Sequence, residues 1–189
     1  MSRFAAVAAV VALGIPFCAA SAQDRPTTVP TRDVDVTYKM TNGDTTLSQR
    51  MRWDVAEQRL RVDPPGQGVY MIIDYRAHGM SLVRDAEHTV YQVQGVGLYL
   101  PGTGNAPFTR RGQETIAGLS CTDWDTRDNA GHPTTVCLTQ DGVMLRVSSG
   151  GTTLAEAASV TYGKQDGSAF HAPQEYRHVN GPPQQMMHP

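Results

Sequence analysis

The sequence predicts a mainly β fold: a single curved antiparallel sheet or half-barrel of about ten strands, with little helix. Three observations support this prediction. Apolar and polar residues alternate with a period of two in most segments beyond residue 33, and turn-forming residues separate those segments at short intervals. The two cysteines beyond the first 22 residues lie in segments that are typical of neighbouring strands. The hydrophobic content of 40% is enough for one core.

The first 22 residues have the features of a cleavable signal peptide. Arg3 supplies the positive start, residues 5–15 form a short apolar run, and residues 20–22 have the small-x-small pattern that precedes cleavage. The run is shorter than the roughly 20 residues that a membrane-spanning helix needs. We therefore expect cleavage near Ala22, a periplasmic or secreted protein, and no membrane span afterwards.

The rest of the chain divides into three parts. Residues 23–32 are polar and contain two prolines, which predicts a flexible arm. Residues 33–177 contain all of the alternating segments and form the predicted antiparallel β domain. Residues 178–189 are rich in Gly, Pro, Gln and Met, which predicts a disordered tail.

In the first half of the β domain, short alternating segments follow one another across clear turns. The Asn42-Gly43-Asp44 run predicts a turn, and Pro64-Pro65-Gly66 ends a later strand. Residues 69–73 are nearly all apolar, which indicates a strand buried on both faces. The predicted strands are residues 33–40, 47–53, 59–63, 69–73, 80–84 and 89–93.

The second half begins with a segment that fits no regular element. Residues 95–107 contain four glycines and two prolines and predict a long loop, a lid or a rim. Residues 116–125, 134–139 and 143–147 then predict a meander, with Asp141-Gly142 as a hairpin turn. The final predicted elements are one helical turn at residues 153–158 and strands at residues 158–162 and 169–176.

Cys121 and Cys137 are predicted to form a structural disulfide. An even pair of cysteines in an exported chain is typical of a disulfide, and a hairpin centred on Asn129 places the two residues directly opposite each other. The alternative, a redox or metal pair, lacks the close cysteine spacing of such sites. Closing a loop of this length contributes about 3 kcal/mol to stability.

Four arginines share the polar face of one predicted hairpin: Arg50, Arg52, Arg59 and Arg61. One interpretation is a solvated face. The other is a patch that binds an anionic headgroup or partner. The alternation leaves both open.

The sequence contains no constellation that indicates catalysis. It lacks a phosphate-binding glycine motif that leads into a helix, a nucleophile elbow and a His-Glu-x-x-His motif. No two histidines have tight ligand spacing; the His and Met residues near the C-terminus could hold copper or reflect chance composition. With a net charge of −2 and no basic patch, nucleic acid is an unsuitable partner. We expect no enzyme activity, no catalytic residues, no metal site and no cofactor.

Two blocks of the chain resemble the periplasmic proteins of lipoprotein-carrier (LolA-like) architecture. The first block comprises residues 49–53, 59–63, 70–74, 80–84 and 89–93, and the second comprises residues 118–121, 137–139 and the 141–142 turn. The resemblance covers most of residues 33–176 and implies an open, curved sheet with an apolar concave face that holds acyl chains or a partner segment. The carriers close their hollow with helices, and this sequence predicts no helix beyond the single turn at residues 153–158.

This resemblance and the alternation together suggest a periplasmic binding module for a hydrophobic, lipid-like or peptide ligand. Its partner would be a lipid, a lipoprotein or another envelope protein. The alternative is an envelope scaffold or assembly protein without a small-molecule ligand. The candidate ligand-binding residues are Leu47, Met51, Trp53, Leu60, Val62, Ile73 and Tyr99. Each of the aliphatic ones is equally suited to an ordinary core.

Overall fold

The computed structural model describes residues 25–66, 68–95, 106–128 and 130–182. Within these ranges the chain forms twelve strands and two short 3₁₀ helices. The predicted signal peptide and the candidate residue Tyr99 lie outside the described residues.

The strands of the first half are β1 (Val34–Asn42), β2 (Thr45–Asp54), β3 (Arg59–Asp63), β4 (Val69–Asp74), β5 (Gly79–Arg84) and β6 (Thr89–Gln94). Those of the second half are β7 (Thr109–Ile116), β8 (Leu119–Arg127), β9 (Pro133–Leu138), β10 (Met144–Ser149), β11 (Thr152–Tyr162) and β12 (Arg177–Asn180). The 3₁₀ helices are η1 (Asp85–Glu87) and η2 (Gly167–Phe170).

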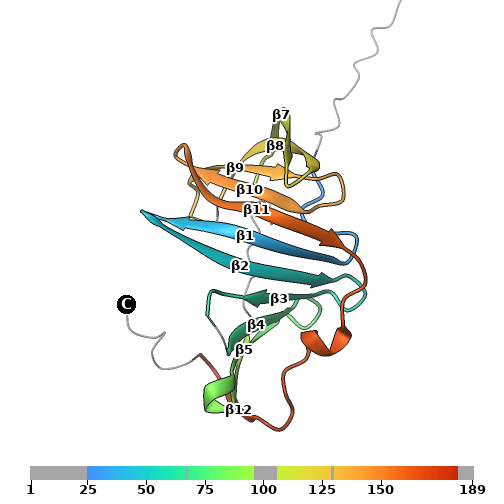
Figure 1. Ribbon diagram of the computed structural model, residues 1–189, viewed down its shortest axis with the longest axis vertical. Coiled ribbons are helices and arrows are strands. Elements are labelled where there is room, and N and C mark those ends of the chain that lie inside the picture. The colour runs from blue at the N-terminus through green and yellow to red at the C-terminus, as the bar shows by residue number, and fades with distance from the viewer. Residues whose placement is uncertain (1–24, 67, 96–105, 129, 183–189) are drawn as a thin grey trace, which may run out of the picture.

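All twelve strands belong to one open, curved sheet with the order β12-β6-β5-β4-β3-β2-β1-β11-β10-β9-β8-β7 (Figure 1). Two meanders, β1–β6 and β7–β11, are joined where β1 pairs with β11, and every pairing except that of β12 is antiparallel. The sheet therefore has two edges, β7 and β12, which lie at opposite ends of the molecule.

The mainly β prediction is confirmed, but the sheet has twelve strands rather than about ten. Two strands were not predicted, because neither has an alternating apolar pattern. All residues of β7 except Ile116 are exposed, and β12 is a polar four-residue strand that pairs parallel to β6 inside the predicted tail. The predicted helical turn at residues 153–158 is instead part of β11, and the predicted strand at residues 169–176 is η2 followed by a turn.

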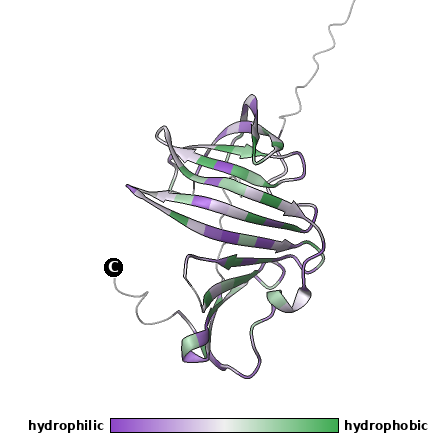
Figure 2. Cartoon of the chain, viewed as in Figure 1, coloured by the Kyte–Doolittle hydropathy of each residue, from purple (hydrophilic) through white to green (hydrophobic). Residues whose placement is uncertain are grey.

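Strand alternation gives the middle of the sheet two different faces (Figure 2). Val34, Val36 and Tyr38 of β1 are less than 5% exposed and lie on one face, which we call the Val36 face. Register places Met51 beside Val36 and Val62 beside Met51, so this face continues over β2 and β3. Its buried side chains form the largest hydrophobic cluster of the described chain.

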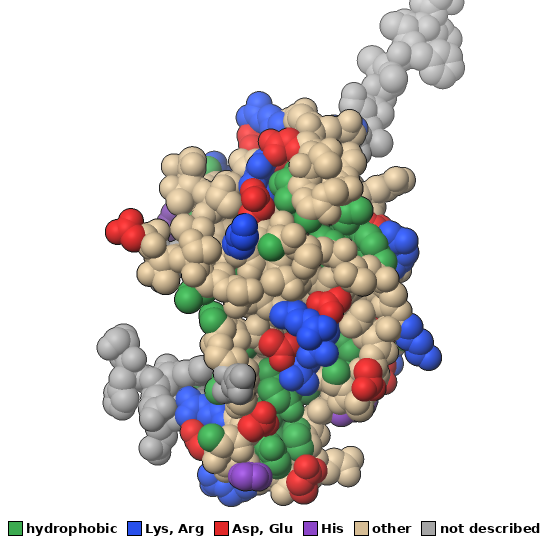
Figure 3. Space-filling model, viewed as in Figure 1, with side chains coloured by type: hydrophobic (Ala, Val, Ile, Leu, Met, Phe, Trp, Pro, Cys, Tyr) green, Lys and Arg blue, Asp and Glu red, His purple; other side chains and the backbone are tan. Residues whose placement is uncertain are grey.

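The opposite face, the arginine face, carries the four predicted arginines. Each has a carboxylate partner: Arg50 contacts Asp35, Arg52 and Arg61 contact Asp63, and Arg59 contacts Asp74. Figure 3 shows cationic and anionic side chains next to one another over the middle strands. The charge is thus neutralised within the chain, which argues against a patch with excess positive charge.

The chain's C-terminal segment, residues 163–182, packs on the arginine face. Phe170 of η2 is 1% exposed, and the carbonyl oxygens of Phe170 and Ala169 accept hydrogen bonds from Arg59 (3.3 Å) and Arg61 (3.0 Å). The Tyr176 hydroxyl donates to Asp85 at 3.3 Å, and β12 then extends the sheet beside β6. Two of the arginines therefore bind the chain's own backbone.

The predicted disulfide between Cys121 and Cys137 is present, with the two Cα atoms 5.5 Å apart. The predicted register was wrong, because Asp123, not Cys121, lies opposite Cys137. The hairpin is centred at position 130, where hydrogen bonds between Asp128 and His132 close a longer turn. The disulfide therefore joins diagonal neighbours.

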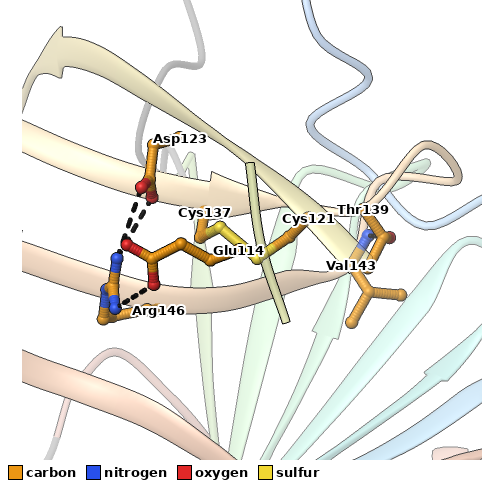
Figure 4. The surroundings of a disulfide bond; sticks show 7 residues. All are labelled: Glu114, Cys121, Asp123, Cys137, Thr139, Val143 and Arg146. Atoms are coloured by element: carbon orange, nitrogen blue, oxygen red, sulfur yellow. Dashed lines mark hydrogen bonds and ion pairs between the residues drawn. A yellow bond between two sulfur atoms is a disulfide. The ribbon is translucent and has the colours of Figure 1, made fainter. Parts of the chain in front are cut away.

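Near the disulfide, Arg146 of β10 binds Glu114 of β7 at 2.6 Å and Asp123 of β8 at 3.2 Å (Figure 4). In a flat sheet, β7 and β10 would be about 14 Å apart, three times the usual strand spacing. This direct contact therefore requires a strong curl of the sheet toward these side chains. Burial, with a further contribution from the Glu114 charge, raises the pKa of Asp123.

Candidate functional site

The structure brings five of the seven predicted ligand-binding residues together on the Val36 face. Register places Trp53 beside Val34 and Leu60, Met51 beside Val62, and Leu60 beside Ile73. Leu47 pairs with Met40 on the same face, but it lies towards the tip of the β1–β2 hairpin and is 44% exposed. The six described members of the predicted set thus form a continuous apolar surface with one outlying member, Leu47.

Sequence reasoning missed several residues of this surface. Val34, Val36 and Tyr38 of β1 and Val143 after the 139–143 turn belong to the same cluster. The alternation in β1 was a sufficient signal for the first three, since β1 was already predicted as a strand. The local sequence does not reveal that Val143 belongs to this face. Its position depends on the long-range pairing of β1 with β11, which brings the second meander to the face.

Within the described part of the predicted N-terminal arm, residues 25–32, Thr28 and Pro30 lie against the Val36 face, whereas residues 25–27 line a separate hollow beside β7 and β8. Burial alternates along the arm: Pro26, Thr28 and Pro30 are half-buried, whereas Thr27 and Val29 are exposed. Thr28 and Pro30 line a small cavity together with Val34, Val36, Tyr38, Met51, Trp53, Leu60 and residues 142–144. The arm thus binds in the manner of an extended peptide, with every second side chain directed to the surface below.

Gly142 allows the arm to approach the 139–143 turn closely. A Cβ atom at this position would overlap the carbonyl oxygen of Val29 and would lie 2.7 Å from its carbonyl carbon. The same Cβ would lie 2.9 Å from the Thr27 methyl group. A side chain at position 142 is therefore incompatible with the arm in its present place.

Asp141 fastens the C-terminal end of the arm to the same turn. Its backbone carbonyl accepts a hydrogen bond from the Thr31 amide at 2.9 Å, and its carboxylate binds Arg32 at 2.7 Å. Burial opposes ionisation of this carboxyl, but hydrogen bonds from Thr139, Arg32 and Tyr162 outweigh it and lower the pKa of Asp141. Arg32 also stacks on the Tyr162 ring, yet its side chain is 60% exposed. The fastening is polar and accessible to solvent.

The cavity beneath the arm has a volume of about 50 Å³. Small-molecule sites usually have volumes of about 300–1,000 Å³, so no drug-sized ligand fits while the arm is in place. Trp53, at the floor of the cavity, is 4% exposed, and its indole N–H has no hydrogen-bond partner in the described structure. A buried donor without an acceptor costs about 1–3 kcal/mol. Its ring packs against Tyr75, whose burial raises the pKa of that phenol to about 12.

A larger hollow in the described structure has a mostly polar lining. This hollow, of about 300 Å³, lies between the C-terminal segment and β3–β6, and Arg59, Asp74, Gln92, Gln94, His171 and His178 are among its lining residues. Across the described ranges, no three His, Cys, Asp or Glu side chains come together as metal ligands would. The described residues also contain no helix that is long and apolar enough to cross a bilayer.

Comparison with known proteins gives no match at the level of sequence. No family model matches the chain, and no curated protein is similar to it at a significant level.

Solved structures do share its fold. An uncharacterised conserved protein from Thermus thermophilus aligns with a TM-score of 0.58 at 10% identity, over 79% of this chain and 91% of that one. MucB from the Pseudomonas aeruginosa MucA/MucB complex aligns with a TM-score of 0.55 at 14% identity, over 79% of this chain and 59% of that one. PNGF-II aligns with a TM-score of 0.54 at 14% identity, over 79% of this chain and 31% of that one.

At these identities the likeness shows the fold alone. MucB has a LolA-like fold, so the predicted resemblance holds for the sheet architecture. This chain spans little more than half of the MucB chain and under a third of PNGF-II. The only helices in the described residues are the short η1 and η2.

Proposed function

We propose that the protein is a non-catalytic binding module of the periplasm, which holds a hydrophobic, lipid-like or peptide ligand on its Val36 face. The observation that carries this proposal is the arm. There, Thr28 and Pro30 of the arm cover apolar side chains of β1, β2 and β3, and the Thr31 amide and the solvent-accessible Arg32–Asp141 ion pair fasten the end of the arm. Apolar surface that is uncovered when such a segment leaves is a candidate interaction site.

One other finding supports this proposal, and another limits how a ligand could bind. MucB, which shares the fold, was solved in complex with MucA, a protein partner. The small cavity beneath the arm argues against a ligand enclosed in the domain as it stands, because the Val36 face is filled by the chain's own side chains. A ligand therefore has to replace the arm rather than enter beside it.

The test compares a released arm with a matched control. Pro30→Asp places a carboxylate against the apolar floor and should release the arm, whereas Val29→Asp adds the same charge at a side chain that is already 37% exposed. We expect a fluorescent fatty acid or naphthalene sulfonate probe to bind the Pro30→Asp protein more tightly than the native and Val29→Asp proteins.

Native mass spectrometry with lipid extraction of the protein purified from periplasm provides the second measurement. A co-purifying lipid or peptide, enriched on the Pro30→Asp protein, supports a binding module. Absence of both probe binding and a co-purifying ligand in all three proteins contradicts the proposal and leaves the envelope scaffold as the function to pursue.

A further inference from the structure

We infer that the Val36 face is a binding groove for an extended, proline-containing peptide with a basic residue at its C-terminal end, and that the N-terminal arm is its built-in competitor. This inference rests on the proposed function and names the ligand class of the same site. It follows from the arm itself, in which Thr28 and Pro30 line the cavity on this face while Thr31 and Arg32 bind Asp141.

The groove selects for an extended backbone. Alternate arm residues are half-buried, and this period of two exists only in an extended chain. Proline suits the groove side of such a segment, since it favours extended conformations and requires no partner for a backbone N–H. The absence of a Cβ at Gly142 leaves room for a backbone carbonyl at Val29, so the groove accepts main chain, not a bulky side chain, at that point.

The end of the groove selects for a cation. The Asp141 carboxylate binds Arg32, and the Tyr162 ring centre lies 3.9 Å from the same guanidinium group. A planar cation that both pairs with a carboxylate and stacks on an aromatic ring is best supplied by arginine. An alkyl chain can neither pair with the Asp141 carboxylate nor stack as a cation on the Tyr162 ring. This site therefore favours a peptide over a plain acyl ligand.

The arm, as a tethered ligand, acts at an effective concentration in the millimolar range and so sets the threshold that a partner has to exceed.

The experiment uses a synthetic peptide of residues 25–32 with blocked ends, titrated by calorimetry into the purified protein. We expect the peptide to bind the native protein weakly and the Pro30→Asp protein at least about tenfold more tightly. In the native protein the docked arm leaves only a small fraction of molecules with a free groove. The same peptide with its own Arg32→Ala change should bind the Pro30→Asp protein more weakly.

Two glycine variants locate the peptide. Gly142→Ala, added to Pro30→Asp, should abolish binding, since the new methyl group occupies the place of the peptide backbone. Gly151→Ala is the matched control: its φ of +80° is close to the +87° of Gly142, but nothing lies within 4 Å of its Cβ position. The Gly151→Ala protein should still bind the peptide. Loss of binding in the Gly142→Ala protein alone would then be due to a blocked groove and not to strain in a glycine turn.

Each outcome decides between the two proposals. If the Pro30→Asp protein binds the hydrophobic probe but not the peptide, the groove takes lipid and the inference is overturned, while the proposed function stands. If the native and Pro30→Asp proteins bind the peptide with equal affinity, the arm does not compete with the peptide, and this part of the inference is wrong. If neither the probe nor the peptide binds, both proposals fail.

Discussion

The two ends of the described chain cover opposite faces of the same sheet, but they are held in different ways. The C-terminal segment buries Phe170 almost completely, binds two arginines through its carbonyl oxygens and finishes as a strand of the sheet. The N-terminal arm forms no strand, and its side chains are at most half-buried. A segment can therefore cover a face of the sheet without being an integral part of the fold. The C-terminal segment is integral to the fold, whereas the arm can detach.

The largest effect expected from this difference is at Phe170. Phe170→Ala removes a fully buried aromatic side chain and should lower the free energy of unfolding by about 3–5 kcal/mol, measured by urea denaturation. Pro30→Asp in the arm should lower it by only about 1–2 kcal/mol, because the tenfold gain in peptide affinity expected from arm release corresponds to about 1.4 kcal/mol of arm docking. A loss of several kcal/mol from Pro30→Asp would show that the arm is an integral element of the fold.

The disulfide tests whether the two ends of the chain are stabilised independently, because it lies near one of them. Cys121 lines the same surface hollow as residues 25–27 of the arm. Replacing Cys121 and Cys137 together by alanine should cost about 3 kcal/mol in urea denaturation, given their separation of 16 residues. We also expect faster hydrogen exchange in β8 and β9 and unchanged exchange in β12. Equal acceleration at β12 would contradict the separation of the two ends.

The smallest effect concerns pH. Because the pKa of Asp141 is lowered in the folded protein, its ion pair stabilises arm docking above the unfolded pKa of about 3.9, and this contribution is lost as the pH falls through the lower, folded value. The NMR signals of Val29 and Thr31 should therefore shift to those of a released arm below about pH 4.

Asp141→Asn is the control for this titration. The variant lacks the titrating carboxyl, so its arm signals should already be displaced at neutral pH and should show no further step in the acid range. If the native and variant titrations coincide, a different group controls the arm.

The faces of the sheet were predictable from sequence because strand alternation is a local property. Val34, Met51, Trp53 and Leu60 each reveal their face through their immediate neighbours. Register is not local. The disulfide between Cys121 and Cys137 was predicted correctly, but their predicted position directly opposite each other was wrong, because residue types in the 128–132 turn do not fix how many residues it uses.

Docking of the arm could not be predicted for the same reason. Its contacts, Thr31 to Asp141 and Val29 to Gly142, join residues more than a hundred positions apart in the chain. Residues 26–30, Pro-Thr-Thr-Val-Pro, have no apolar periodicity that marks a buried surface. Pairing of the four arginines with carboxylates was likewise invisible, since Asp35, Asp63 and Asp74 come from three different strands.

The edges of the sheet have a consequence for how copies of the protein meet. β7 is polar along most of its length and has a register shift between Arg110 and Gln113, and β12 is only four residues long. Bulged, charged or very short edge strands resist the addition of a foreign strand and so protect against self-association into fibrils. The protein should therefore stay monodisperse at high concentration. Partners should bind the faces of the sheet and not its edge strands.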